Sequence, residues 1–152
     1  MATLVEVKAY YDKDPDALFR DAMNFGELQE AMRGIAVYEG LTDGPARVGD
    51  TYTADVTFFG FWKTKGHVIH VEALDCKTRI LQSREHNPSI QRWDHQISVQ
   101  PENGTTCWTD SIIIDAGWQT FGAARFASFI YQRRHRYRKA LKITMRREPT
   151  NA

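Results

Sequence analysis

The stretch QRWDHQISVQPENGTTCWTDSIIID, residues 91–115, decides the fold. It alternates apolar and polar side chains on both sides of the turn signal Asn103-Gly104, which is typical of an antiparallel β-hairpin. A sheet with one apolar face must cover that face with another element. The apolar face of this hairpin is expected to carry Trp93, His95, Ile97, Val99, Trp108, Asp110, Ile112 and Ile114.

Two polar residues, His95 and Asp110, interrupt this apolar face. A four-residue turn places them directly opposite each other, and a two-residue turn at Asn103-Gly104 makes them diagonal neighbours, so we expect contact in either register. A carboxylate beside an imidazole fixes its tautomer and raises its basicity, as a general base or a polarised donor requires. A pair that only satisfies itself inside the sheet is the alternative interpretation.

Residues 51–115 as a whole are expected to form five consecutive strands, because turn signals recur at Gly60, Asp75, Asn87 and Asn103. If the hairpin turns have four residues, Glu85 falls on the polar face and Arg84 lies opposite His67. Arg84 is then a candidate to neutralise an anionic ligand oxygen, or to extend to solvent. The apolar face gains Tyr52, Ala54, Val56, Phe58, His67, Ile69, Val71, Ile80, Gln82 and Arg84.

The flanking segments complete an α+β fold. An alternating strand at residues 3–10 precedes two short helices, and a short strand is expected at residues 35–39. The stretch from Trp118 to about Met145 is long enough for one helix, whose aromatic residues would cover the sheet. We therefore predict a curved, seven-stranded antiparallel sheet wrapped around a long C-terminal helix, with residues 1–147 forming one domain and residues 148–152 a flexible tail.

Composition narrows the class of protein. The chain has 152 residues, of which 42% are hydrophobic and 26% charged, close to the average of soluble globular domains. No secretory signal, nucleotide-binding glycine motif or nucleophile elbow is visible. Cys76 and Cys107 lack metal-site spacing, and His67 and His70 would point to opposite faces of a strand. We expect no metal, no cofactor and a cytoplasmic location.

Positive charge gathers near the end of the sequence, so the rest of the chain is net acidic. This block predicts either a patch for nucleic acid or anionic lipid, or the solvated face of a helix docked on an acidic body. Eight of the 20 Lys and Arg residues form it: Arg133, Arg134, Arg136, Arg138, Lys139, Lys142, Arg146 and Arg147.

The order of elements resembles the SRPBCC superfamily, whose START-like, pollen-allergen-like helix-grip fold includes polyketide cyclase/dehydrase and lipid-transfer branches. The resemblance rests on RVGD at residues 47–50, RWDH at 92–95, NGTTCWTD at 103–110 and FIYQRRHR at 129–136. It implies a deep cavity for a hydrophobic small molecule between sheet and helix. The superfamily hosts binders, carriers and enzymes, so the fold does not choose among them.

Three functions are compatible with this sequence. The first is binding of a hydrophobic or aromatic small molecule, and the second is a cyclase or dehydratase in which His95, Asp110 and Arg84 handle protons and negative charge. The third is binding of nucleic acid or an anionic membrane through the basic helix. Homodimerisation through an exposed strand edge stays open. The expected ligand-binding residues are Tyr52, Val56, His67, Ile69, Gln82, Trp93, Trp108, Ile112, Trp118 and Phe121.

Overall fold

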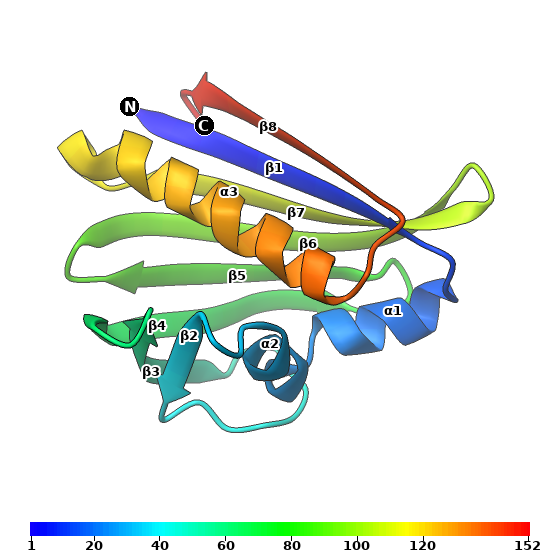
Figure 1. Ribbon diagram of the computed structural model, residues 1–152, viewed down its shortest axis with the longest axis horizontal. Coiled ribbons are helices and arrows are strands. Elements are labelled where there is room, and N and C mark those ends of the chain that lie inside the picture. Colours follow the sequence, from blue (N-terminus) through cyan, green and yellow to red (C-terminus); the bar gives the residue numbers. More distant parts are fainter.

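Eight strands pair antiparallel in one curved sheet in the computed structural model, which describes residues 1–152 (Figure 1). Their order across the sheet is β2-β3-β4-β5-β6-β7-β1-β8, so β2 and β8 are the edges. The strands are β1 (Ala2–Tyr11), β2 (Ala36–Glu39), β3 (Thr51–Phe58), β4 (Trp62–Asp75), β5 (Ile80–Asn87), β6 (Ile90–Glu102), β7 (Thr105–Asp115) and β8 (Lys142–Thr150).

Two short helices follow β1, as the sequence predicts. Helix α1 (Pro15–Ala22) begins at Asp14, whose side chain accepts a hydrogen bond from the backbone of Ala17, and α2 (Phe25–Ala31) begins at Asn24 in the same way. A 3₁₀ turn, η1 (Gly117–Gln119), leads into α3 (Thr120–Tyr137). Figure 1 shows α3 lying across one face of the sheet, with α1 and α2 near its C-terminal end. None of the helices is both long and apolar enough to cross a bilayer.

The predicted α+β helix-grip architecture is confirmed, but the chain end differs from the prediction. Helix α3 ends at Tyr137 rather than near Met145, because Lys139 adopts a left-handed backbone conformation (φ 58°) that turns the chain back toward the sheet. The following residues form β8, which pairs with β1 and makes the sheet eight-stranded rather than seven-stranded. Residues 148–150, expected in a tail, belong to this strand.

The buried face of α3 also differs from the expectation. The large aromatic residues Trp118, now in η1, and Phe121, in α3, were expected to cover the sheet, yet both are exposed. The helix instead packs on β1 through a stripe of small residues, and small side chains allow helix and sheet to approach closely. The buried residues of α3 are Thr120, Ala124, Ala127, Ser128, Tyr131, Arg134 and His135.

Register irregularities bracket β5 and reverse its faces. On β4, Val71 pairs with Ser83 but Ala73 pairs with Gln82, so Glu72 forms a bulge, and a second irregularity follows Glu85. Each shifts the register by one residue, which sends side chains to the opposite face. The predicted faces of β5 are therefore wrong. The second shift reverses the first, so the predicted faces of β6 are correct. Leu81, Ser83 and Glu85 face inward, and Gln82 and Arg84 face outward.

Three of the eight basic residues near the end of the sequence are paired with carboxylates within the fold. The buried Arg134 forms an ion pair with Glu27, and Arg138 lies 2.7 Å from Glu27 and 2.9 Å from Asp21. On β8, Arg146 pairs at 3.0 Å with Glu6 of the neighbouring strand β1. The basic block is thus divided between a helix docked on acidic residues of α1 and α2 and an edge strand.

Candidate functional site

A cavity of about 630 Å³ lies between the sheet, α2 and α3. Of the 33 residues that line it, 22 are hydrophobic, so its walls favour an apolar occupant. Strands β3 to β6 supply one wall, and α2 and α3 supply the other. Aromatic side chains form much of the lining: Phe25, Tyr38, Phe58, Trp62, Trp93, Trp118, Phe121, Phe126 and Tyr131.

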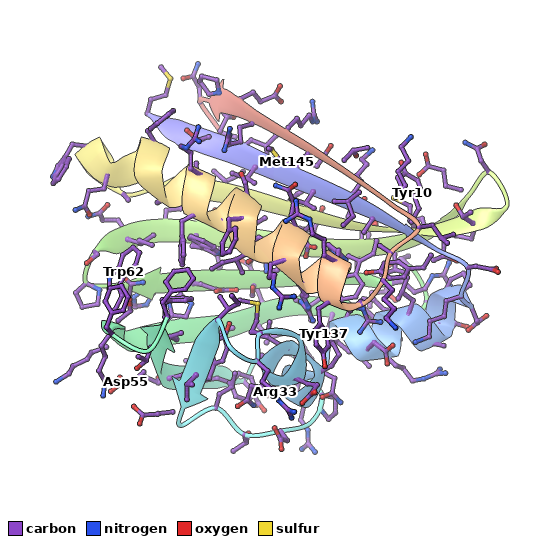
Figure 2. The ribbon with its side chains drawn as sticks, in the orientation of Figure 1. Tyr10, Arg33, Asp55, Trp62, Tyr137 and Met145 are labelled. Atoms are coloured by element: carbon purple, nitrogen blue, oxygen red, sulfur yellow. The ribbon has the colours of Figure 1, made fainter.

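The cavity reaches the surface between the β3–β4 hairpin and the start of α3. Trp62, Trp118 and Phe121 line it, and they are 52%, 91% and 72% exposed, respectively. The Trp62 ring lies 5.3 Å from that of Phe126 on α3, and Figure 2 shows Trp62 at the same end of the molecule as the N-terminal part of this helix. An aromatic rim of this kind offers an apolar molecule contact before it enters.

Polar groups gather inside the cavity around Glu85 of β5. The Glu85 carboxylate accepts hydrogen bonds from Ser83 Oγ at 2.8 Å and from His67 Nε2 at 2.9 Å. Asn87 Nδ2 lies 3.3 Å from His67 Nδ1, which orients the imidazole with its Nε2–H toward Glu85. Each of these side chains lines the cavity, so an occupant meets a carboxylate held in a defined position.

His95 and Asp110 touch, as the sequence predicts. His95 Nε2 donates to Asp110 Oδ1 at 2.8 Å, and the diagonal arrangement follows from a two-residue turn in which Glu102 pairs with Thr105. The other oxygen, Oδ2, accepts from His135 Nε2 of α3 at 2.8 Å. Because both oxygens of Asp110 are occupied by imidazoles, this buried carboxylate joins the sheet to the helix.

The cluster continues beyond Asp110, away from the cavity. Tyr11 Oη lies 2.7 Å from His135 Nδ1, so the hydroxyl donates to the ring when His135 uses Nε2–H for Asp110. The His135 ring also packs against Trp108 in an edge-to-face arrangement, with centroids 4.8 Å apart. These groups are buried, and they hold the Asp110 carboxylate in place.

The surroundings of His95 favour its charged form. Its second nitrogen, Nδ1, lies 3.4 Å from Tyr131 Oη and 3.7 Å from Glu85 Oε1. Burial alone would lower the pKa of His95, but the hydrogen bond to Asp110 and the negative charges of Asp110 and Glu85 outweigh it and raise the pKa to about 9. His95 is thus an imidazolium at neutral pH, a donor at both nitrogens.

The two carboxylates of the cluster stay ionised. Burial would raise the pKa of Glu85, but its bonds to His67 and the nearby His95 outweigh burial and lower the pKa to about 2. The pKa of Asp110 also lies well below its usual range, because the two imidazoles that contact it overcome the effect of burial. The cavity therefore presents a fixed anion, Glu85, beside a fixed cation, His95.

The structure brings some of the predicted site residues together and separates others. The cavity is lined by Val56, His67, Ile69, Trp93, His95, Trp118 and Phe121 from the predicted set. It is not lined by Tyr52, Gln82, Arg84, Trp108, Asp110 or Ile112.

Packing explains the misplaced residues. Trp108 and Ile112 are fully buried in the core, and Tyr52 packs edge-to-face on Phe25. Gln82 and Arg84 lie on the outer face because of the bulge at Glu72. Arg84 is half exposed there, and it pairs with Asp94 and Glu72 at 2.5 and 3.0 Å. Arg84 therefore lies outside the cavity, where its predicted role would have it contact an occupant.

Several cavity residues were not predicted. Glu85 was assigned to the polar face, and only a bulge, which has no sequence signal here, brings it inside. Tyr131 lies within the quoted helix motif, and its Oη accepts a hydrogen bond from Trp93 Nε1 at 3.3 Å. Phe25 and Leu28 come from α2, a helix that the sequence predicts without indicating what its side chains line.

Comparison with known proteins supports the fold. No family model and no curated protein matches the chain. Among solved structures, protein CV1439 from Chromobacterium violaceum is similar with a TM-score of 0.71 and 12% identity, covering 89% of this chain and 94% of that one. The protein TTHA0849 from Thermus thermophilus is similar with a TM-score of 0.63 and 14% identity, covering 88% and 95%.

Ara h 8.0201 is also similar, with a TM-score of 0.63 and 10% identity over 90% of this chain and 97% of that one. These likenesses extend over nearly the full length of each chain, so the whole arrangement of sheet and gripped helix is shared. The chain therefore has the Bet v 1-like helix-grip fold. At such low identities the likeness concerns the fold alone.

Proposed function

We propose that this protein binds a hydrophobic or aromatic small molecule in the cavity between the sheet and α3. The observation that carries the proposal is the cavity itself, with a volume of about 630 Å³ and predominantly hydrophobic walls. Pockets of this size and lining are those that bury most of a small ligand's surface. The exposed aromatic rim at Trp62, Trp118 and Phe121 supports entry at that end.

The ionisation of the cluster supports binding rather than base catalysis. A general base must accept a proton, but an imidazole whose pKa is about 9 already carries one at neutral pH, so His95 is not poised as a base. Both oxygens of Asp110 are engaged by histidines. Arg84, the third member of the predicted catalytic set, lies on the outer face.

The proposal is tested by filling the cavity. Ile130 of α3 lines it at a partly buried position, so Ile130→Trp should occupy ligand space. Fluorescence titration with the neutral dye Nile red should show binding to the unaltered protein and affinity weakened about tenfold or more in the variant. Native mass spectrometry of the purified protein should also reveal a bound small molecule.

The matched control is Val37→Trp, which adds the same ring at an exposed position on β2 outside the cavity. Its affinity for Nile red should equal that of the unaltered protein. If Nile red does not bind, or binds Ile130→Trp and Val37→Trp equally well, the cavity is not the binding site.

We also propose that the chain is a member of the SRPBCC superfamily, for which the shared helix-grip fold and the motifs at residues 92–95 and 103–110 are the support. A reducing compartment such as the cytoplasm fits Cys76 and Cys107, which are both free thiols.

A further inference from the structure

The carboxylate of Glu85 has unused hydrogen-bonding capacity that faces the cavity. Oε1 accepts from Ser83 and Oε2 accepts from His67, one bond each. A carboxylate offers about four acceptor positions, so about half of them are free. The side chain is 11% exposed and lines the cavity, so its remaining positions are open to an occupant.

The adjacent donor is also incompletely used. His95 Nε2 is committed to Asp110, whereas Nδ1 lies 3.4 Å from Tyr131 Oη and 3.7 Å from Glu85 Oε1. Both distances exceed those of a well-formed hydrogen bond, for which about 2.8 Å is usual with a charged donor. A buried cationic donor with only long contacts is costly unless another acceptor reaches it.

A hydroxyl group matches this pair. Its oxygen can accept from His95 Nδ1–H while its proton is donated to Glu85 Oε1. The two protein atoms are 3.7 Å apart, so an oxygen about 2.8 Å from each completes a compact triangle. We propose that Glu85 and His95 form a hydroxyl subsite, and that the ligand class is a neutral, largely apolar molecule carrying a phenolic or alcoholic hydroxyl. This inference rests on the proposed function of the cavity.

The same geometry discriminates against other apolar ligands. A carboxylate-bearing molecule such as a fatty acid would bring a second negative charge against Glu85, which has no proton to offer. A hydrocarbon of the same shape would cover Glu85 and His95 without replacing the hydrogen bonds that water makes to them. The subsite should therefore rank ligands by their polar group rather than by their size.

Three fluorescent ligands with one ring system test this ranking: pyrene, 1-hydroxypyrene and pyrene-1-carboxylate. With the unaltered protein near neutral pH, 1-hydroxypyrene should bind about tenfold tighter than pyrene, and pyrene-1-carboxylate should bind most weakly. Glu85→Gln keeps the side-chain shape and removes the charge, so it should reduce the preference for 1-hydroxypyrene and strengthen binding of the carboxylate. The control, Glu148→Gln, changes an exposed carboxylate on β8 outside the cavity and should leave the ranking unaltered.

Equal affinities for pyrene and 1-hydroxypyrene in the unaltered protein would overturn the hydroxyl subsite and leave the proposed function standing. Tightest binding of pyrene-1-carboxylate would overturn it as well. Failure of all three ligands and of Nile red to bind would overturn both proposals. The ranking in the unaltered protein decides the matter even where Glu85→Gln does not fold.

Discussion

His95 sits between two carboxylates, and its chemistry follows from that position. Asp110 receives Nε2–H at 2.8 Å, and Glu85 lies on the Nδ1 side. An opposite charge within a few ångströms in a buried setting stabilises the imidazolium more than burial destabilises it. The ring is therefore better suited to donating hydrogen bonds to a ligand than to removing protons from one.

This placement predicts the titration of His95. Its pKa should be about 9 in the unaltered protein, because the charges of Asp110 and Glu85 favour the protonated ring. In Asp110→Asn the hydrogen-bonded anion is lost while burial remains, so the pKa should fall by at least about one unit. Nitrogen-detected NMR of the histidine rings measures both values. An unchanged titration in Asp110→Asn would contradict this account.

At the scale of elements, helix α3 is positioned by small residues. Ala124, Ala127 and Ser128 form the stripe that meets the sheet, and this close approach places Tyr131 and His135 within reach of His95 and Asp110. Other large side chains of the helix point to the cavity, as Phe126 does, or to solvent, as Phe129 does. The polar cluster thus depends on the distance between helix and sheet.

Enlarging one member of this stripe should loosen the fold. Ala127 has no exposed surface, so Ala127→Leu inserts three carbon atoms where no space exists. Overpacking of this kind costs about 1–3 kcal/mol, which should appear as a lower urea midpoint for unfolding. A variant as stable as the unaltered protein would show that the contact between α3 and β1 is not tightly packed.

A substitution elsewhere in the same helix should act in the opposite direction. Gly122 is exposed and helical, and a Cβ added there would meet no atom within 4 Å. Gly122→Ala should therefore stabilise the protein by about 0.5–1 kcal/mol through helix propensity alone. The urea midpoint measures this gain, and no gain would mean that this first turn of α3 adds little to folding.

At the scale of the whole molecule, the buried cluster ties stability to pH. The pKa of His95 is raised from 6.5 to about 9, so its contribution to the free energy of unfolding is complete below pH 6.5 and is lost as pH rises through 9. The pKa of Glu85 is lowered from 4.5 to about 2, so its contribution is present above pH 4.5 and is lost as pH falls through 2. Both contributions are complete only between about pH 4.5 and pH 6.5.

We therefore expect the urea midpoint to be highest between about pH 4.5 and 6.5 and to decline toward pH 9. His95→Gln should flatten the decline on the alkaline side, because the titrating ring is gone, even where the variant is less stable at every pH. A decline of equal slope in His95→Gln would assign the alkaline loss to other groups.

Local patterns in the sequence were sufficient for much of this fold. Alternation on both sides of Asn103-Gly104 sorted β6 and β7 correctly, because side chains of a strand point to opposite faces with a period of two. Asp14 and Asn24 marked two helix starts through their own hydrogen bonds. The contact between His95 and Asp110 followed from the same alternation, since it survives either choice of turn.

What the tertiary structure alone decided is the inner face of β5, the rotation of α3 and the existence of β8. A bulge at Glu72 depends on how the sheet bends around the helix, so no residue nearby signals that Glu85 turns inward. The end of α3 near Lys139 and the pairing of β8 with β1 likewise depend on an edge supplied by the other end of the chain. Long-range contacts of this kind override local propensity, which is why the groups facing the ligand could not all be predicted from the sequence.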